Sequence, residues 1–103
     1  MVVAGKIEAL RLTGRLDASS VGDVRARLND IIDNHPIGDI VVDLSDVDLV
    51  DATGLGVLAA THRRLEREGR MLVLRGCTAP IHRVLAVTRL LRVLHVEPVS
   101  RPA

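Results

Sequence analysis

The stretch VDLSDVDLVDATGLGVL, residues 42–58, joins an apolar run, an acidic segment and the start of a helix. The apolar run begins at Ile40 and is interrupted only by Asp43, as in a central strand that is buried on at least one face. A helix is expected from near Thr53 to Gly69, because apolar residues recur there at helical spacing and glycine is favourable just past a helix end. The stretch therefore predicts a strand, a loop and a helix, with a hydroxyl residue and two glycines where the helix starts.

Strands and helices are expected to alternate on both sides of this stretch. The sequence predicts a strand over residues 7–12 that closes at Gly14, and a helix from residue 21 that Pro36 ends. After Gly69, we expect a strand over residues 71–74, a helix that starts at Thr78 and an edge strand over residues 93–96.

Short connections between these elements indicate one α/β domain. We expect the domain to span residues 1–103, with a core at about 7–97 and a frayed tail after it. Its sheet is predicted to be mixed, with about four to five strands packed with helices, and a fully parallel sheet is the alternative.

The composition limits the classes of function. Hydrophobic residues make up 48% of the chain and Phe, Tyr and Trp are absent, so the core must be aliphatic and no aromatic ring can stack on a nucleic-acid base. A net charge of +1 gives no general attraction to nucleic acid or to an anionic membrane. Cys77 is the single cysteine, and no N-terminal segment resembles a signal peptide or a membrane span. We therefore expect a cytoplasmic protein without direct nucleic-acid binding or membrane insertion.

Two motifs resemble STAS domains of the anti-sigma factor antagonist type. The family signature is an apolar strand that ends in Asp-Leu-Ser, a short loop, and Asp-Ser-Ser-Gly or Asp-Ser-Thr-Gly at a helix start; here residues 51–54 read Asp-Ala-Thr-Gly. Gly14, Leu16 and Asp17 match the early Gly-x-Leu-Asp of the family. Ala52 stands where the family usually has serine, and the residues before position 7 are few for the opening strand of many members.

The resemblance implies a phosphorylation switch rather than an enzyme. In the family, the unphosphorylated protein binds an anti-sigma factor and frees a sigma factor. The anti-sigma factor is a Ser/Thr kinase of the GHKL type that phosphorylates the second hydroxyl of the signature, and a PP2C-type phosphatase reverses the reaction. The acceptor role carries over to Thr53 alone. The predicted partner-binding residues are Asp17, Asp51, Ala52, Thr53, Gly54, Leu55 and Gly56.

Physical chemistry is compatible with this role. A threonine at a helix start lies beside free backbone N–H groups and the positive end of the helix dipole. Phosphate would add about −1.5 to −2 charges to a segment that already holds four aspartates and no basic residue. The simpler alternative is that Thr53 is only a helix N-cap, which contributes about 1 kcal/mol, and that Asp17 and Asp51 are likewise caps or dipole partners.

Other functions have weaker support. The aspartates lack the glycine and glutamate of a calcium loop, so no metal site is predicted. Gly54, Gly56 and Ala59 match the spacing of a dinucleotide turn, but the acidic ribose partner is missing after the next strand, so no cofactor is predicted. Cys77 and His82 form no recognisable nucleophile motif. The main alternative is a STAS subunit of another assembly, such as a lipid-transport ABC complex.

Overall fold

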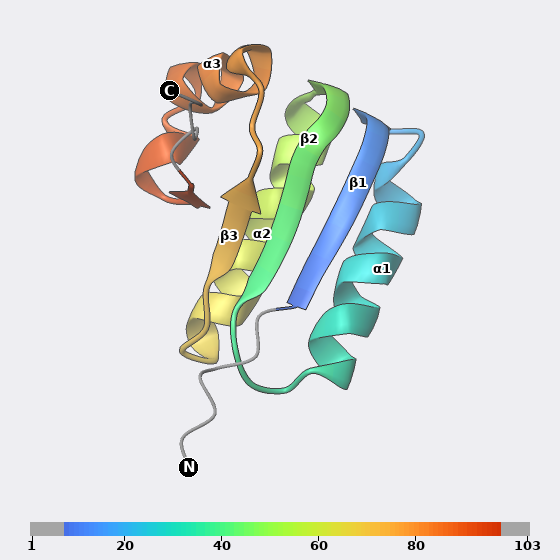
Figure 1. Ribbon diagram of the computed structural model, residues 1–103, viewed down its shortest axis with the longest axis vertical. Coiled ribbons are helices and arrows are strands. Elements are labelled where there is room, and N and C mark those ends of the chain that lie inside the picture. The colour runs from blue at the N-terminus through green and yellow to red at the C-terminus, as the bar shows by residue number, and fades with distance from the viewer. Residues whose placement is uncertain (1–7, 98–103) are drawn as a thin grey trace, which may run out of the picture.

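The computed structural model describes residues 8–97, which form a single sheet covered by helices (Figure 1). The α/β class is confirmed. None of the helices within this range combines the length and the apolar character that crossing a bilayer requires. In chain order, the elements are β1 (Glu8–Leu16), α1 (Val21–Asn34), β2 (Ile40–Val50), α2 (Ala52–Arg67), β3 (Leu72–Arg75), α3 (Ala79–Val87), the 3₁₀ helix η1 (Leu90–Arg92) and β4 (His95–Val96).

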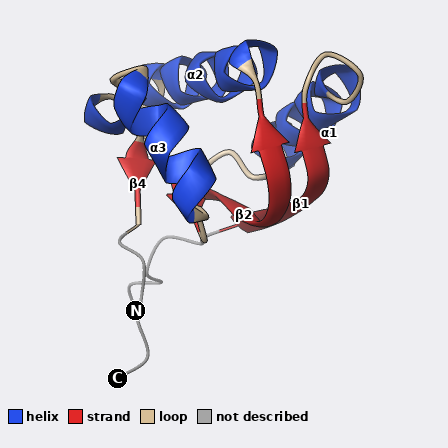
Figure 2. Cartoon of the chain, turned by 90° about the horizontal axis from the view of Figure 1, so that it is seen from above, coloured by secondary structure: helices blue, strands red, loops and turns tan. Residues whose placement is uncertain are grey.

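The four strands lie in the order β1-β2-β3-β4, and every pairing between them is parallel. The antiparallel component of the predicted mixed sheet is therefore not found in residues 8–97. Each strand is joined to the next by a helical segment that returns the chain to the same end of the sheet, which makes neighbouring strands parallel. Crossovers of this kind are right-handed, so strands added in one direction place their helices on one face. Figure 2 shows α1 and α2 together on that face.

The first two strands are longer than predicted. Gly14 was expected to close the first strand, but β1 continues through it, and the pairing with β2 shifts register between Gly14 and Arg15. Gly14 has φ 77°, a backbone conformation that glycine adopts without a steric penalty. This glycine therefore accommodates an irregularity inside the strand. β2 likewise extends to Val50, through residues that were expected to form a loop.

The core is aliphatic, as the composition requires. Helix α1 contributes the apolar stripe that its sequence predicts, and α2 buries Leu55, Leu58, His62 and Leu65 along one face. Gly69 follows α2 with φ 71°, in agreement with its predicted position past the helix end. The last strand is shorter than expected, because η1 and the buried Leu94 precede it. The tail predicted to fray lies outside the described residues.

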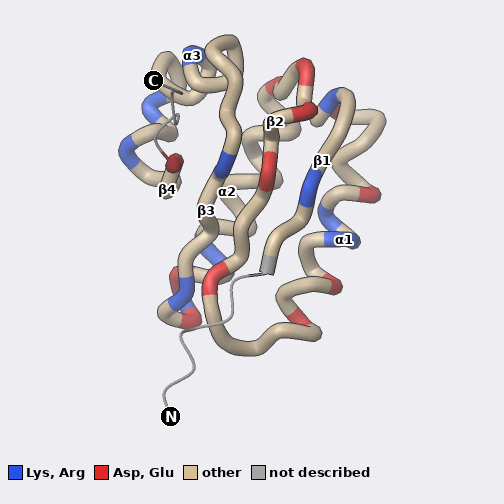
Figure 3. Tube along the Cα trace, in the orientation of Figure 1, with Lys and Arg blue, Asp and Glu red and all other residues tan. Residues whose placement is uncertain are grey.

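Charged positions that alternate in sign from strand to strand run across the middle of the sheet (Figure 3). Arg11 of β1 is in register with Asp43 of β2, which is in register with Arg75 of β3. Arg75 Nε then lies 2.9 Å from Glu97 Oε1, beyond the end of β4. Opposite charges on neighbouring strands favour this register. We call these four residues the charge ladder.

Candidate functional site

Thr53 is the second residue of α2, and its side chain is exposed. The N-cap is Asp51, whose Oδ1 accepts a hydrogen bond of 2.9 Å from the backbone N–H of Gly54. The interpretation of Thr53 as the N-cap is therefore wrong, and Asp51 has the capping role. The Thr53 hydroxyl makes no hydrogen bond with any residue between 8 and 97.

The backbone around Thr53 presents hydrogen-bond donors. The first bond of the helical pattern runs from the N–H of Leu55 to the carbonyl oxygen of Asp51, at 2.9 Å. The N–H groups of Ala52 and Thr53 come before it and have no acceptor within the helix. They lie at the positive end of the helix dipole, which favours an anion. A phosphate carried by the neighbouring hydroxyl would be tolerated here.

Gly54 fixes the position of the helix start against β1. A Cβ atom added to Gly54 would lie 2.4 Å from the carbonyl oxygen of Leu16 and 2.7 Å from its Cγ. The N–H of Asp51 also donates to the same Leu16 oxygen at 3.2 Å. Only glycine permits this approach. It joins the end of β1, with Asp17 directly after it, to residues 51–56, and we call this region the Thr53 corner.

Asp17 organises the turn between β1 and α1. Its Oδ1 accepts hydrogen bonds from the Ser19 hydroxyl at 2.6 Å and from the Ser19 N–H at 3.0 Å. The hydrogen bond from the Ser19 side chain is the main reason that the pKa of Asp17 lies below its ordinary value of 3.8. The predicted helix start at these residues is confirmed. Within residues 8–97, the side-chain hydrogen bonds of Asp17 stay inside this turn.

The five predicted partner-binding residues within α2 divide into two groups. Gly54 and Leu55 are buried, so they position the helix and have little surface to offer a partner. Ala52, Thr53 and Gly56 are exposed. A Cβ added to Gly56 would meet no atom within 4 Å, so close packing inside this chain does not explain that glycine. The exposed positions at the start of α2 therefore carry only small side chains, one of which has a hydroxyl group.

The acidic segment is partly neutralised in three dimensions. Asp46 forms an ion pair of 2.6 Å with Arg11 of the neighbouring strand, a contact that the local sequence could not reveal. Asp48 is exposed and forms no ion pair with any residue of the described range. Within that range, no three His, Cys, Asp or Glu side chains are arranged to hold a metal ion.

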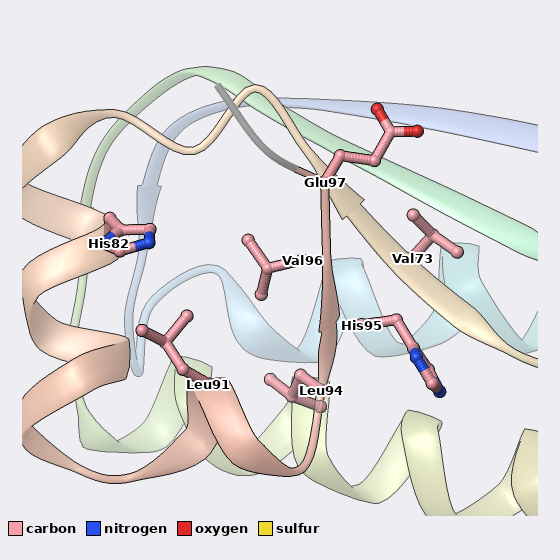
Figure 4. A pocket seen from close by; sticks show the side chains of 7 residues that line it. All are labelled: Val73, His82, Leu91, Leu94, His95, Val96 and Glu97. Carbon is pink, nitrogen blue, oxygen red and sulfur yellow. The ribbon is translucent and has the colours of Figure 1, made fainter. Parts of the chain in front are cut away.

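A pocket of about 600 Å³ lies away from the Thr53 corner, and Figure 4 shows His82 of α3 and His95 of β4 on opposite sides of it. No predicted site residue reaches it. Cys77, between β3 and α3, is buried, and desolvation raises the pKa of its thiol above the ordinary value of 9.0. A thiol in this state is a poor nucleophile. The residues that line the pocket are Val73, His82, Leu91, Leu94, His95, Val96 and Glu97.

Comparison with known proteins identifies the family. The family model described as the STAS domain matches residues 1–103. The chain belongs to the STAS domain family. A curated relative, the anti-sigma F factor antagonist of Paenibacillus polymyxa, is 25% identical over 87 residues, which are 84% of this chain and 74% of the relative.

Solved structures of the family share the fold. An anti-sigma factor antagonist from Mycobacterium paratuberculosis is 27% identical, with a TM-score of 0.73 over 90% of this chain and 78% of that one. The Bacillus cell fate determinant SpoIIAA, in its phosphorylated form, is 21% identical, with a TM-score of 0.66 over 95% of this chain and 88% of that one.

Proposed function

We propose that this STAS domain is an anti-sigma factor antagonist and that Thr53 is its phosphorylation switch. The unmodified protein binds an anti-sigma factor and thereby frees a sigma factor. Relatives that bear the name anti-sigma factor antagonist support the first part of this proposal. The second part rests on the structure of the Thr53 corner.

The main support for this role is that Thr53 is exposed while another residue caps its helix. The Asp51 carboxylate accepts the hydrogen bond from the Gly54 N–H, and this leaves the Thr53 hydroxyl available to a kinase. A threonine that served as the cap would be needed for helix stability, and its modification would disturb the helix start. Phosphorylation of Thr53 instead changes the surface and spares the fold.

Phosphate at Thr53 would weaken binding through charge and desolvation. It adds about −1.5 to −2 charges beside Asp51, on the exposed surface that also includes Gly56. A docked partner would have to bury that charge or lose contact with the start of α2. A loss of about 3 kcal/mol would reduce affinity roughly a hundredfold.

The proposal assigns two partners and no catalytic role to this chain. The anti-sigma factor is a Ser/Thr kinase of the GHKL type, for which Thr53 is the substrate, and a PP2C-type phosphatase restores the free hydroxyl. The exchange takes place in the cytoplasm. Asp17 and Asp51 support the interface by fixing the Thr53 corner, through the turn at Ser19 and the cap at Gly54.

The test is phosphorylation by an anti-sigma factor kinase of the GHKL type from the same organism. The protein is incubated with the kinase and ATP, and the phosphate is mapped by mass spectrometry. We expect phosphate on Thr53, none in Thr53→Ala, retention in Thr53→Ser, and release of the kinase from the modified protein. Tight binding without any phosphate would refute the switch and favour a constitutive STAS module such as a subunit of a lipid-transport ABC complex.

A further inference from the structure

A groove of about 220 Å³ runs between α1 and α2 on the helical side of the domain. The two helices are tied together beside it, because Arg64 of α2 donates to the Asn29 side chain of α1 at 2.9 Å. Residues of α2 line one wall, and longer polar side chains of α1 line the other. The lining residues are Arg25, Asn29, Val57, Ala60, Thr61 and Arg64.

The groove continues the exposed surface of the Thr53 corner. Thr53, Ala60 and Arg64 follow one another at helical spacing along the same face of α2. With a rise of 1.5 Å per residue, Ala60 lies about 10 Å along the helix from Thr53. Gly56 lies between them, exposed and without any packing requirement inside this chain. A protein surface laid on Thr53 therefore extends to the groove over a path free of large side chains.

The charge on the α2 side of the groove is already matched. Arg64 Nη2 lies 2.5 Å from Asp33 Oδ1, and its Nε lies 3.7 Å from Glu68 Oε2. Together with the bond to Asn29, these contacts hold the guanidinium in place. Arg64 is therefore a structural clamp between the helices, with little charge left for a ligand.

Arg25 on the α1 side is different. It is exposed, and it forms no ion pair or hydrogen bond with any residue from 8 to 97. The positions three and four residues away on α1 are Val21, Gly22, Leu28 and Asn29, none of which is acidic. Arg25 is thus an unmatched cation on the rim of a groove that is continuous with the proposed interface.

We propose that this groove receives an acidic side chain of the anti-sigma factor and that Arg25 pairs with its carboxylate. The inference rests on the proposed function and adds a second contact, about two helical turns from Thr53. An arginine can bind a carboxylate through two parallel hydrogen bonds, so it fixes the orientation of the partner as well as attracting it. The volume suits one side chain, since pockets for small molecules are usually about 300–1,000 Å³.

A protein partner fits the surroundings better than a nucleic acid does. The segments next to the helix start carry the carboxylates of the exposed Asp48 and the half-buried Asp17, and these would repel a phosphate backbone. A folded partner can place an acidic group at Arg25 and keep its other charges away from the aspartates. The interface would therefore be negative near the start of α2 and positive at the groove, which favours one orientation of the partner.

The experiment measures the affinity of the unphosphorylated full chain for the anti-sigma factor kinase by titration calorimetry. We expect affinity to fall about fivefold to tenfold in Arg25→Ala and about thirtyfold or more in Arg25→Glu, with most of it kept in Arg25→Lys. The loss should shrink as salt is raised, because the contact is electrostatic. Ala60→Leu, which fills the groove, should weaken binding without affecting Arg25 itself.

Arg83→Glu on α3 is the matched control, because it makes the same change of charge at an exposed arginine that lies outside the groove. It should leave affinity within twofold of the unmodified chain. Circular dichroism establishes that all variants are folded. If Arg25→Glu binds like the parent while phosphorylation of Thr53 still releases the kinase, the groove inference is wrong and the proposed function stands. If the parent chain does not bind the kinase at all, both the groove inference and the proposed function are wrong.

Discussion

Gly54 and Gly56 are two residues apart in α2, yet the fold requires only the first. The start of α2 contacts Leu16 so closely that a methyl group at Gly54 would overlap the carbonyl oxygen, whereas Gly56 faces open space. Glycine inside a helix destabilises it by about 0.5–1 kcal/mol relative to alanine, and no close contact inside this chain requires glycine at position 56. That cost is understandable if a partner approaches the helix backbone there.

We expect Gly54→Ala to lower the free energy of unfolding by about 2–3 kcal/mol, because the overlap forces α2 away from β1. Gly56→Ala is the matched control and should raise it by about 0.5–1 kcal/mol. Urea denaturation followed by far-ultraviolet circular dichroism measures both, since the chain has no Trp or Tyr for fluorescence. Equal stability of the two variants would contradict the close contact at Leu16.

At the scale of the element, the cap of α2 separates stability from recognition. Asp51→Ala removes the acceptor for the Gly54 N–H and should cost about 1 kcal/mol of stability, while Asp51→Asn keeps an acceptor and should cost only a few tenths. Thermal unfolding gives the first comparison. Affinity for the anti-sigma factor is then measured for the same two variants. An equal loss of affinity in both would show that the charge of Asp51 itself contacts the partner. Unchanged stability in Asp51→Ala would rule out the capping role.

The elements themselves were largely predictable, because helical spacing and glycine or proline ends are local signals. Helices α1 and α2 begin and end close to the predicted residues, and α3 begins directly after the predicted Thr78. The ends of the first two strands were not predictable in this way. Continuation of β1 past Gly14 depends on pairing with β2, which lies far away in the sequence.

The same reasoning applies to the site. The motif drew attention to Thr53 and Asp51, but the choice of the cap depends on the bond from the Asp51 N–H to Leu16, which fixes where the strand ends and the helix begins. The Arg11–Asp46 pair and the unmatched Arg25 also arise from tertiary structure. A single sequence shows the charges but not which of them are neutralised.

For the whole molecule, the two carboxylates of the charge ladder, Asp43 and Glu97, make the stability of the fold depend on pH. The Ser45 hydroxyl is the main cause that holds the pKa of Asp43 below its ordinary 3.8, and the hydrogen bond from Arg75 holds the pKa of Glu97 below its ordinary 4.5. Both carboxylates are ionised in the folded state at pH values where the unfolded chain begins to take up protons. Their contribution is therefore complete above about pH 4.5 and is lost as the pH falls through the lowered folded-state values.

We expect the melting temperature to be level near neutral pH and to fall below pH 4.5, and to fall less steeply in Asp43→Asn and Glu97→Gln. Thermal melts between pH 7 and pH 2.5 measure this slope. Asp30→Asn, at an exposed position of α1 without an ion pair in the described range, is the control for the loss of one carboxylate. A variant slope identical to that of the parent would show that the ladder does not contribute.

The order of the strands in the sheet is also their order in the chain. As the nascent polypeptide leaves the ribosome, each new strand meets its parallel neighbour already synthesised, and no strand has to be inserted between two earlier ones. All residues of the Thr53 corner, and both walls of the groove beside it, lie between the start of β1 and the end of α2. The complete recognition surface has therefore been synthesised before translation of β3 begins.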